Sequence, residues 1–372
     1  MPDIPPGLRD TPQGAQLRRI LGELTERLLP TLLSRAPEEA AGALLDRARR
    51  EASPLRFAAV VLALGARAVD PTTRPEALAA ARAISAPGER PGAESPIQSA
   101  RLAPRQTGLD EEIFLLDLPQ VRLPTRIGRV ALEGLKRYFA TLHQPRPAQR
   151  AIDVGTGSGV LAIVAAKQLR RLGGLDRVWG VDVNPWAVLL ARANAALNGE
   201  SERIDFLESD GLAALCQQGI EGSVDLILSN PPMTVGLPGQ PLTVEDRFNV
   251  VEHPVEFIKR ELIEKGFRLL RPPSGHLLFH ISGRFPEALQ NLSSIPGFGQ
   301  KKAVLQGLTE LDPYVDLRGL VYRELIQDRP FIFLKGYPVE IQRVTATEAH
   351  ILRKQGGRLY QQSYVWVYGF QP

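Results

Sequence analysis

A regular alternation of strand and helix patterns between residues 150 and 282 constrains the fold of this 372-residue chain more than any other feature. Short runs of apolar and β-branched residues predict strands at 150–155, 177–183, 203–209, 224–230 and 275–282. Between them, apolar residues at helical spacing predict helices at 160–172, 187–197 and 254–270. Such alternation is typical of βαβ units, which build a parallel sheet with helices on both faces. We therefore predict an α/β fold with a Rossmann-like doubly wound sheet.

The first ninety or so residues differ from this pattern, because they carry only helical periodicity. Helices are predicted at 16–35, with a break near Pro30, and then at 38–50, 55–69 and 74–84. The segment 85–108 is rich in Pro, Gly and Ser and is predicted to be a linker or an ordered loop. We therefore divide the chain into an N-terminal helical domain with its linker, 1–105, and a Rossmann-like catalytic domain with a C-terminal extension, 106–372. In that extension, 329–337 and 363–370 have strand composition and are predicted to pair antiparallel at the edge of the sheet.

Composition and charge exclude several classes of protein. The formal charge of +4 leaves a nucleic acid partner open, but cations and carboxylates are interleaved and no basic block of five or six residues occurs. A single cysteine, Cys216, excludes an internal disulfide framework. There is no secretion signal pattern and no apolar run of about 18 residues. We expect a cytoplasmic protein with no membrane segment, assign no metal site, and leave the oligomeric state open.

A glycine-rich loop, DVGTGSG at 153–159, ends the first predicted strand and opens a helix. Glycines permit positive φ and let a ligand approach the main chain closely, although a tight turn alone would explain them. The next strand ends at Asp182, where a carboxylate can accept hydrogen bonds from ribose hydroxyls. Loop and acid together predict a cofactor that contains a nucleoside.

The spacing of the glycines separates two cofactor classes. Dinucleotide sites usually have G-x-G-x-x-G, with a pyrophosphate at the helix N-terminus. Here Gly155, Gly157 and Gly159 are spaced G-x-G-x-G and follow Asp153. S-adenosylmethionine has no phosphate, and its ammonium group suits an acidic residue upstream, so the loop favours this cofactor over NAD. Asp210, after the third strand, would accept a hydrogen bond from the adenine amino group, or else act as a helix N-cap.

The fourth predicted strand stops at Asn230, Pro231 and Pro232. Proline fixes its own φ and restricts the preceding residue to extended conformations, so the carbonyls of Asn230 and Pro231 are rigidly aimed. Two such acceptors can hold the N–H groups of an amide or amine, and methyl transfer depends mainly on holding a nitrogen in line at near-attack distance. A simple strand stop is the competing interpretation. We expect Asn230 and Pro231 to be catalytic.

These motifs, in this order, resemble those of class I S-adenosylmethionine-dependent methyltransferases. Within that class they are similar to the branch with an Asn-Pro-Pro-aromatic signature, which includes release-factor glutamine methyltransferases and nucleobase N-methyltransferases. The resemblance implies S-adenosylmethionine as cofactor and a layout with N-terminal helices. We expect cofactor contacts from Asp153, Gly155, Thr156, Gly157, Gly159, Asp182, Val183, Asp210, Gly211 and Asn230.

The chain departs from this branch at Met233, where relatives carry an aromatic residue. A thioether covers a planar group loosely and adaptably, which favours an amide or amine acceptor, on a small molecule or a protein, over a nucleobase. Pro232 and Met233 are expected to face the substrate, and the following loop to cover it. The alternative function keeps the cofactor but uses its aminocarboxypropyl part, by transfer or ring closure, and releases methylthioadenosine. Trp186 is expected either to flank the adenine or to pack in the core.

Overall fold

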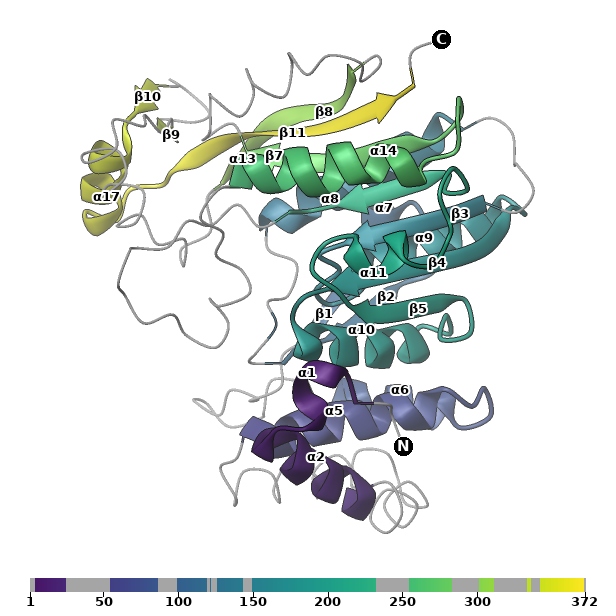
Figure 1. Cartoon of the computed structure of the whole chain (residues 1–372). Coiled ribbons are helices and arrows are strands. Elements are labelled where there is room, and N and C mark those ends of the chain that lie inside the picture. Colours follow the sequence, from purple (N-terminus) through teal and green to yellow (C-terminus); the bar gives the residue numbers. More distant parts are fainter. Residues whose placement is uncertain are drawn as a thin grey trace. The chain divides into compact units, whose positions relative to one another are not determined.

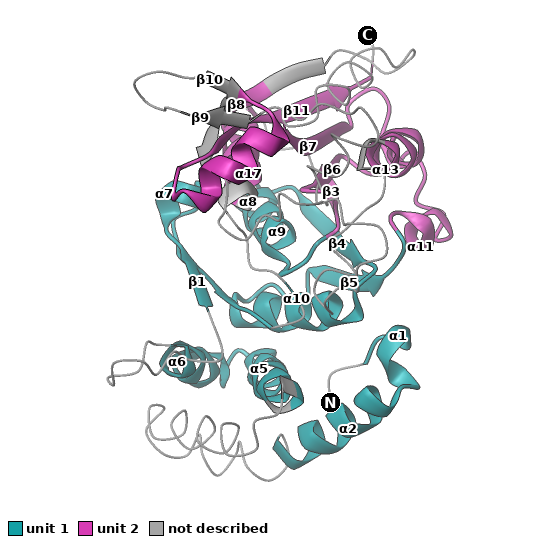
Figure 2. Ribbon diagram, turned by 90° about the vertical axis from the view of Figure 1, so that its left-hand side faces the viewer, with its two compact units in different colours: residues 1–123, 146–148, 156–210 teal, residues 124–145, 149–155, 211–372 magenta. Residues whose placement is uncertain are grey.

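The computed structural model describes residues 4–24, 54–85, 99–118, 121, 126–142, 149–231, 254–282, 301–310, 333–335 and 342–370. The chain forms two compact units, coloured separately in Figure 2. Unit 1 comprises Met1–Leu123, Arg146–Ala148 and Thr156–Asp210, and unit 2 comprises Pro124–Pro145, Gln149–Gly155 and Gly211–Pro372. The predicted division at 105/106 stays a prediction.

Unit 1 contains two βα repeats, made by α9 (Val160–Arg171), β4 (Leu175–Asp182), α10 (Pro185–Leu197) and β5 (Ile204–Glu208). β4 and β5 pair in parallel, with Asp182 opposite Glu208, so both strands end at the same edge. α10 begins where Asn184 accepts a hydrogen bond from the Trp186 amide at 3.0 Å, with Pro185 in the first turn. Nearly every residue of α10 is buried, because the helix is covered on more than one side.

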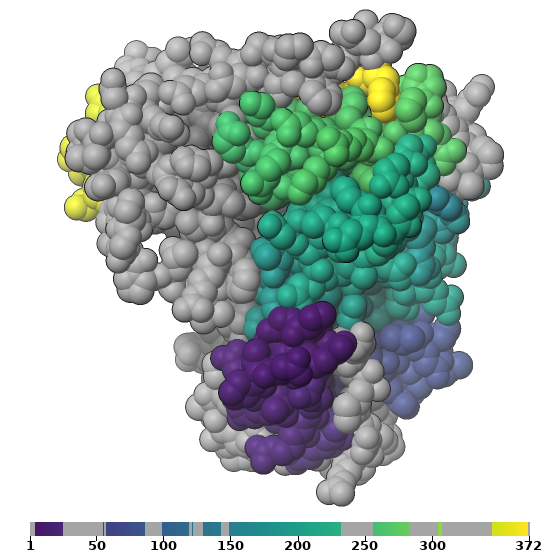
Figure 3. All heavy atoms as spheres, in the orientation of Figure 1, coloured from purple at the N-terminus to yellow at the C-terminus, as the bar shows by residue number. Residues whose placement is uncertain are grey.

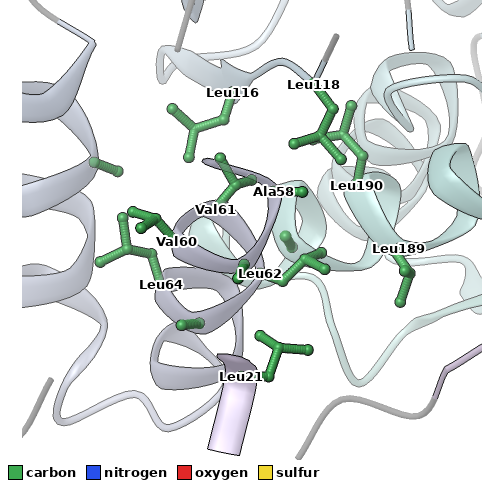
Figure 4. Packing of buried hydrophobic residues seen from close by; sticks show 14 of the residues in the cluster. Leu21, Ala58, Val60, Val61, Leu62, Leu64, Leu116, Leu118, Leu189 and Leu190 are labelled. Carbon is green, nitrogen blue, oxygen red and sulfur yellow. The ribbon is translucent and has the colours of Figure 1, made fainter. Parts of the chain in front are cut away.

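The N-terminal helices of unit 1 are α1 (Pro6–Arg9), α2 (Pro12–Glu23), α5 (Pro54–Ala68) and α6 (Arg74–Ile84). Their apolar residues join those of α10 in one core, part of which Figure 4 shows, with Val61 and Leu62 of α5 near Leu189 and Leu190 of α10. α5 contacts α2, α6 and α10. In Figure 3, the purple residues of α1 and α2 lie directly against the teal part of unit 1, where α1 contacts α10.

The helix predictions for this region are confirmed at α5 and α6. α2 begins at Pro12, earlier than predicted, because the Thr11 side chain caps it by accepting the Gly14 amide at 3.0 Å. The predicted break at Pro30 and the helix at 38–50 lie outside the described residues.

The predicted linker contains regular structure from residue 99 onward. β1 (Ser99–Leu102) and β2 (Ile113–Leu116) pair antiparallel, and α7 (Pro104–Thr107) lies between them. The linker prediction was therefore wrong for 99–108. The composition of β1 suggests a loop because only Leu102 of this strand is buried. The hairpin is held by β2, in which all four residues are buried.

Unit 2 holds a mixed sheet in the strand order β10-β9-β11-β7-β6-β3 (Figure 1; β6 is labelled in Figure 2). β3 (Gln149–Val154), β6 (Leu226–Ser229) and β7 (His276–Ser282) are parallel, and β11 (Tyr360–Gly369) is antiparallel to β7. β8 (Lys301–Glu310) also pairs with β11, and β9 (Phe333–Lys335) pairs with β10 (Gln342–Val344). The predicted α/β, Rossmann-like fold is confirmed.

The C-terminal pairing was predicted only in part. β9 and β11 do pair antiparallel, but only at Tyr360 and Leu334. β11 lies between β7 and β8 or β9, so its predicted position at the sheet edge was wrong. β8 pairs with β11 and so covers the edge that was predicted to be free. This strand was not predicted because its sequence mixes polar and apolar residues.

The helices of unit 2 are α8 (Arg126–Ala140), α11 (Ala213–Cys216), α13 (Pro254–Phe257), the π-helical η2 (Ile258–Lys265), α14 (Gly266–Leu269) and α17 (Ala346–Lys354). α13, η2 and α14 are consecutive and form the helix predicted at 254–270. α8 packs against β7, β8 and β11, with Gly134 so close to Val365 that an added Cβ would lie 2.5 Å from it. Among the helices in the described ranges, none is both long and apolar enough to cross a membrane.

The crossing of α5 and α10 gives a stability prediction. A Cβ on Gly65 of α5 would overlap Ala193 of α10. In an open helix, Gly→Ala stabilises by about 1 kcal/mol, whereas overpacking a tight contact costs about 1–3 kcal/mol. We expect Gly65→Ala to lower the free energy of unfolding, measured by urea titration, with the helical circular dichroism signal retained. An increase in stability would show that the two helices are not in close contact.

Candidate active site

The glycine loop is fixed by hydrogen bonds to the end of β4. The Thr156 amide donates to the Val181 carbonyl at 3.0 Å, and the Gly157 amide donates to Oδ2 of Asp182 at 2.8 Å. The Gly159 amide closes the turn by donating to the Thr156 carbonyl at 2.8 Å. Gly155, Gly157 and Gly159 all have positive φ, at 71°, 53° and 82°. Glycine is needed at each of them, because other residues adopt this region at a cost.

The glycines serve two different purposes. A Cβ on Gly155 or Gly157 would meet no atom within 4 Å, so both leave open space beside the main chain. A Cβ on Gly159 would lie 3.0 Å from the Cβ of Ala191, so this glycine allows α9 and α10 to pack closely. The loop can therefore receive a ligand at its first two glycines, while the third serves packing.

Asp182 at the end of β4 is the acid that organises this edge of unit 1. Besides Gly157, its carboxylate accepts the Asn184 amide at 2.9 Å. Burial raises the pKa of the Asp182 carboxyl above its usual value, while hydrogen bonds from the amides of Asn184, Gly157 and Val183 oppose that shift. Asp182 is half-buried, and its predicted role in binding ribose hydroxyls stays a prediction.

Other predicted residues lie at the same edge. Val183 is unusual for a large apolar side chain in being 46% exposed. Asp210 is exposed just after β5, and the Ser209 amide donates to the Asp182 carbonyl at 2.9 Å. An acidic side chain and an exposed apolar one therefore lie beside Asp182.

Two alternatives from the sequence are now decided. Asp210 is not a helix N-cap, because α11 begins at Ala213 with Leu212 in the cap position. Trp186 is only 3% exposed and belongs to the core of unit 1, so core packing accounts for it. The sequence could not decide either case, because each residue fits both of the interpretations that were offered for it.

In unit 2, the Asn-Pro sequence follows β6 beside the start of the glycine loop. Ser229 pairs with Val154 of β3, and its hydroxyl donates to the Val154 carbonyl at 2.8 Å. Asn230 is the next residue and is half-buried, and Pro231 is buried. Asp153 is buried in β3, at 1% exposure. The parallel register therefore brings Asn230 and Gly155 to neighbouring strand ends.

Gly211, predicted to contact the cofactor, has a packing role. Its φ is 56°, and a Cβ there would overlap the buried side chain of Glu261. Glu261 in turn accepts the Leu212 amide at 3.4 Å and two contacts from Lys265 at 2.8 Å. A direct role of Gly211 toward the cofactor stays a prediction.

A polar cluster that the sequence did not indicate lies at the end of β7. The Ser282 hydroxyl donates to Oε1 of Gln361 at 3.1 Å, and Nε2 of Gln361 donates to the Ser363 hydroxyl at 3.3 Å. All three side chains are fully buried. Serine and glutamine in a strand are ordinary on a solvated face, so only the structure shows that they form part of the core.

The remaining predictions cannot be placed. Pro232, Met233 and the loop that follows lie outside the described residues. Within the ranges that the structure describes, no group of three or more His, Cys, Asp or Glu side chains is arranged to hold a metal ion.

Comparison with protein families identifies the domain that contains these strand ends. The family model described as "Methyltransferase small domain" matches residues 134–254. Residues 134–254 are therefore similar to a methyltransferase small domain. The match covers the C-terminal half of α8, the glycine loop, Asp182 and the Asn-Pro sequence, and the resemblance to class I methyltransferases is thereby confirmed.

Curated relatives match over part of their length. A release factor glutamine methyltransferase of Chlorobaculum tepidum is 48% identical over 120 residues, which are 32% of this chain and 39% of that protein. One from Moorella thermoacetica is 29% identical over 202 residues, 52% of this chain and 67% of the relative. A ribosomal protein L11 methyltransferase of Thermus thermophilus is 39% identical over 132 residues, 35% of this chain and 45% of the relative.

Two solved structures match part of this chain. The N-terminal domain of human METTL16 in complex with SAH is 14% identical, with 79% of this chain and 83% of that chain covered at a TM-score of 0.41. The ribosomal protein L11 methylase of Lactobacillus delbrueckii subsp. bulgaricus is 24% identical, with 51% and 76% covered at a TM-score of 0.32.

The methyltransferase small domain implies S-adenosylmethionine as cofactor, and the residues of unit 1 fit it. The open space at Gly157 allows a close approach to the main chain. The Asp182 carboxylate suits ribose hydroxyls, and the exposed Val183 suits the flat apolar face of adenine.

The raised pKa of Asp182 predicts how cofactor binding depends on pH. Ribose hydroxyls donate to the ionised carboxylate, so binding should weaken when Asp182 is protonated. Because burial raises the pKa, we expect affinity for S-adenosylhomocysteine to fall on acidification at a pH above the usual 3.8 of an aspartate. Asp182→Asn should weaken binding at neutral pH and remove this titration, as measured by calorimetry. An unchanged pH profile in the variant would exclude Asp182 as the group responsible.

The open glycines give a second prediction, with a matched control. Gly157 and the exposed Gly173 both have positive φ, at 53° and 74°, and neither has an atom within 4 Å of an added Cβ. Alanine at either position should cost a similar backbone strain, about 1–2 kcal/mol. Only Gly157→Ala should also weaken binding of S-adenosylhomocysteine, by about tenfold or more. Equal affinities of the two variants would show that no ligand approaches Gly157.

Proposed function

We propose that this chain is an S-adenosylmethionine-dependent methyltransferase that acts on an amide or amine nitrogen. The observation that supports this most directly is the register of β3 and β6. Val154 pairs with Ser229, so Asn230 and Pro231 follow at the strand end next to the glycine loop. A methyltransferase small domain with an Asn-Pro-Pro sequence at this place has the acceptors that a nitrogen nucleophile needs.

The bound cofactor supplies an electrophilic methyl group on a sulfonium centre. The chain's own residues have to hold the acceptor nitrogen. The Asn230 side-chain carbonyl and the Pro231 main-chain carbonyl would accept its N–H groups, which directs the nitrogen lone pair away from both and fixes the approach. Proline restricts Asn230 to extended backbone, and the hydrogen bond from Ser229 to Val154 anchors the preceding residue. A rigid acceptor pair of this kind gives the orientation on which in-line transfer depends.

The acceptor that we propose is the side-chain amide of glutamine in a protein. Two of the relatives are named release factor glutamine methyltransferases, and a third is named a putative protein N5-glutamine methyltransferase, from Methanocaldococcus jannaschii. Met233 in place of an aromatic residue supports an amide over a nucleobase, because a thioether orients a flat ring weakly. The release factor and ribosomal protein named as substrates of the relatives belong to translation, which supports a cytoplasmic reaction.

Asn230→Ala tests the proposed reaction. We expect this variant, at saturating S-adenosylmethionine, to methylate glutamine-containing proteins at least about a hundredfold more slowly than the wild type, because orientation of the acceptor nitrogen is lost. Methyl incorporation and the nucleoside product are followed by mass spectrometry.

The nucleoside product distinguishes the alternatives. Release of S-adenosylhomocysteine with methylated glutamine supports the proposal. Release of methylthioadenosine without an added acceptor would instead show use of the aminocarboxypropyl part, and methylation at full rate by Asn230→Ala would exclude the proposed role of this residue.

A further inference from the structure

Two asparagines hold strand β2 by its main chain: Asn194 in the last turn of α10 and Asn198, the residue that caps the C-terminus of this helix. Oδ1 of Asn194 accepts the Leu116 amide at 2.9 Å, and its Nδ2 donates to the Leu116 carbonyl at 3.1 Å. Asn198 does the same at Phe114, where the distances are 3.1 and 2.7 Å. Each asparagine side chain thus makes, to one residue of β2, the pair of main-chain hydrogen bonds that a neighbouring strand would make. Since Leu116 and Phe114 are both buried, these bonds are partly shielded from water.

The two asparagines differ in their third hydrogen bond. Nδ2 of Asn194 also donates to the Ser158 carbonyl at 3.0 Å, in the middle of the glycine loop. Nδ2 of Asn198 instead donates to the Asn194 carbonyl at 2.7 Å, at the C-terminal end of α10. Each side chain therefore makes three hydrogen bonds, but of the two asparagines only Asn194 joins β2 to the loop.

The bond to Ser158 orients a peptide group that shapes the loop. The Ser158 carbonyl and the Gly159 amide belong to the same planar peptide. Its amide donates to the Thr156 carbonyl at 2.8 Å, so Asn194 and Thr156 fix this peptide from opposite sides. Asn194 is 0% exposed and Ser158 3% exposed, which makes a lost hydrogen bond here costly to the local conformation.

We propose that Asn194 is a positioning residue that couples the docking of the β1–β2 hairpin to the cofactor affinity of the glycine loop. When β2 is docked, Asn194 is held by Leu116 and presents its second N–H to Ser158. This keeps the Gly157 amide directed at Asp182 and the open side of Gly157 available. The inference depends on the proposed function only for the identity of the ligand.

Binding linkage makes this coupling reciprocal. A ligand that favours the ordered glycine loop must also favour the docked state of β2, by the same free energy. Ligand binding should therefore stabilise the hydrogen bond from the Leu116 amide to Asn194 more than the one from the Phe114 amide to Asn198. A purely structural role of Asn194 would not produce this difference.

The first test compares Asn194→Ala with Asn198→Ala in the full chain. Both variants lose two hydrogen bonds to β2 and one further bond, so both should have a lower Tm by a similar amount. We expect the Kd for S-adenosylhomocysteine to rise about tenfold or more in Asn194→Ala and to stay within about twofold in Asn198→Ala. Equal changes in Kd would overturn the inference. If the wild-type chain bound no S-adenosylhomocysteine, the proposed function would fail instead.

A second measurement needs no variant, in case Asn194→Ala does not fold. Amide hydrogen exchange of the wild-type chain is followed with and without S-adenosylhomocysteine. We expect the ligand to slow exchange at Leu116 by a clearly larger factor than at Phe114. The same factor at both amides would show that β2 and the loop are not coupled through Asn194.

Discussion

The hydrogen bond from the Gly157 amide to the Asp182 carboxylate is the interaction on which the candidate site depends most. It joins a loop of three positive-φ glycines to the end of β4, and the same carboxylate starts the turn into α10 through the Asn184 amide. One side chain therefore sets the path of the chain after two strands. Partial burial of the carboxylate is unfavourable, as the raised pKa of Asp182 shows. The same arrangement leaves the neighbouring Val183 exposed, and we propose that a planar ligand covers it.

Strand register explains why residues far apart in sequence serve one chemistry. In unit 2, pairing of Val154 with Ser229 carries Asn230 to the edge where β3 ends, so no side chain has to reach far. In unit 1, pairing of Asp182 with Glu208 places Asp210 just beyond the same edge. The residues that we propose for binding and catalysis lie where parallel strands stop, whereas residues within the strands mainly supply the core.

Much of this could be predicted from the sequence, because short-range rules decide it. Local conformation explains the positive-φ glycines, the acid at the strand end and the two prolines. Their patterns can therefore be recognised in the sequence. β8, the β1–β2 hairpin and the buried polar cluster of Ser282, Gln361 and Ser363 were missed, because tertiary burial and not local pattern defines them. Asn194 was missed for a related reason. An asparagine inside a helix is locally unfavourable, and only its distant partners explain it.

α10 has a further consequence through its position in the core of unit 1. The helix packs on β4 and β5 and also on α5, where Gly65 meets Ala193 without a Cβ between them. Replacing the N-terminal helices by another module would therefore require changes in α10 as well. The surface that α10 presents to α5 limits which modules could be joined to this unit.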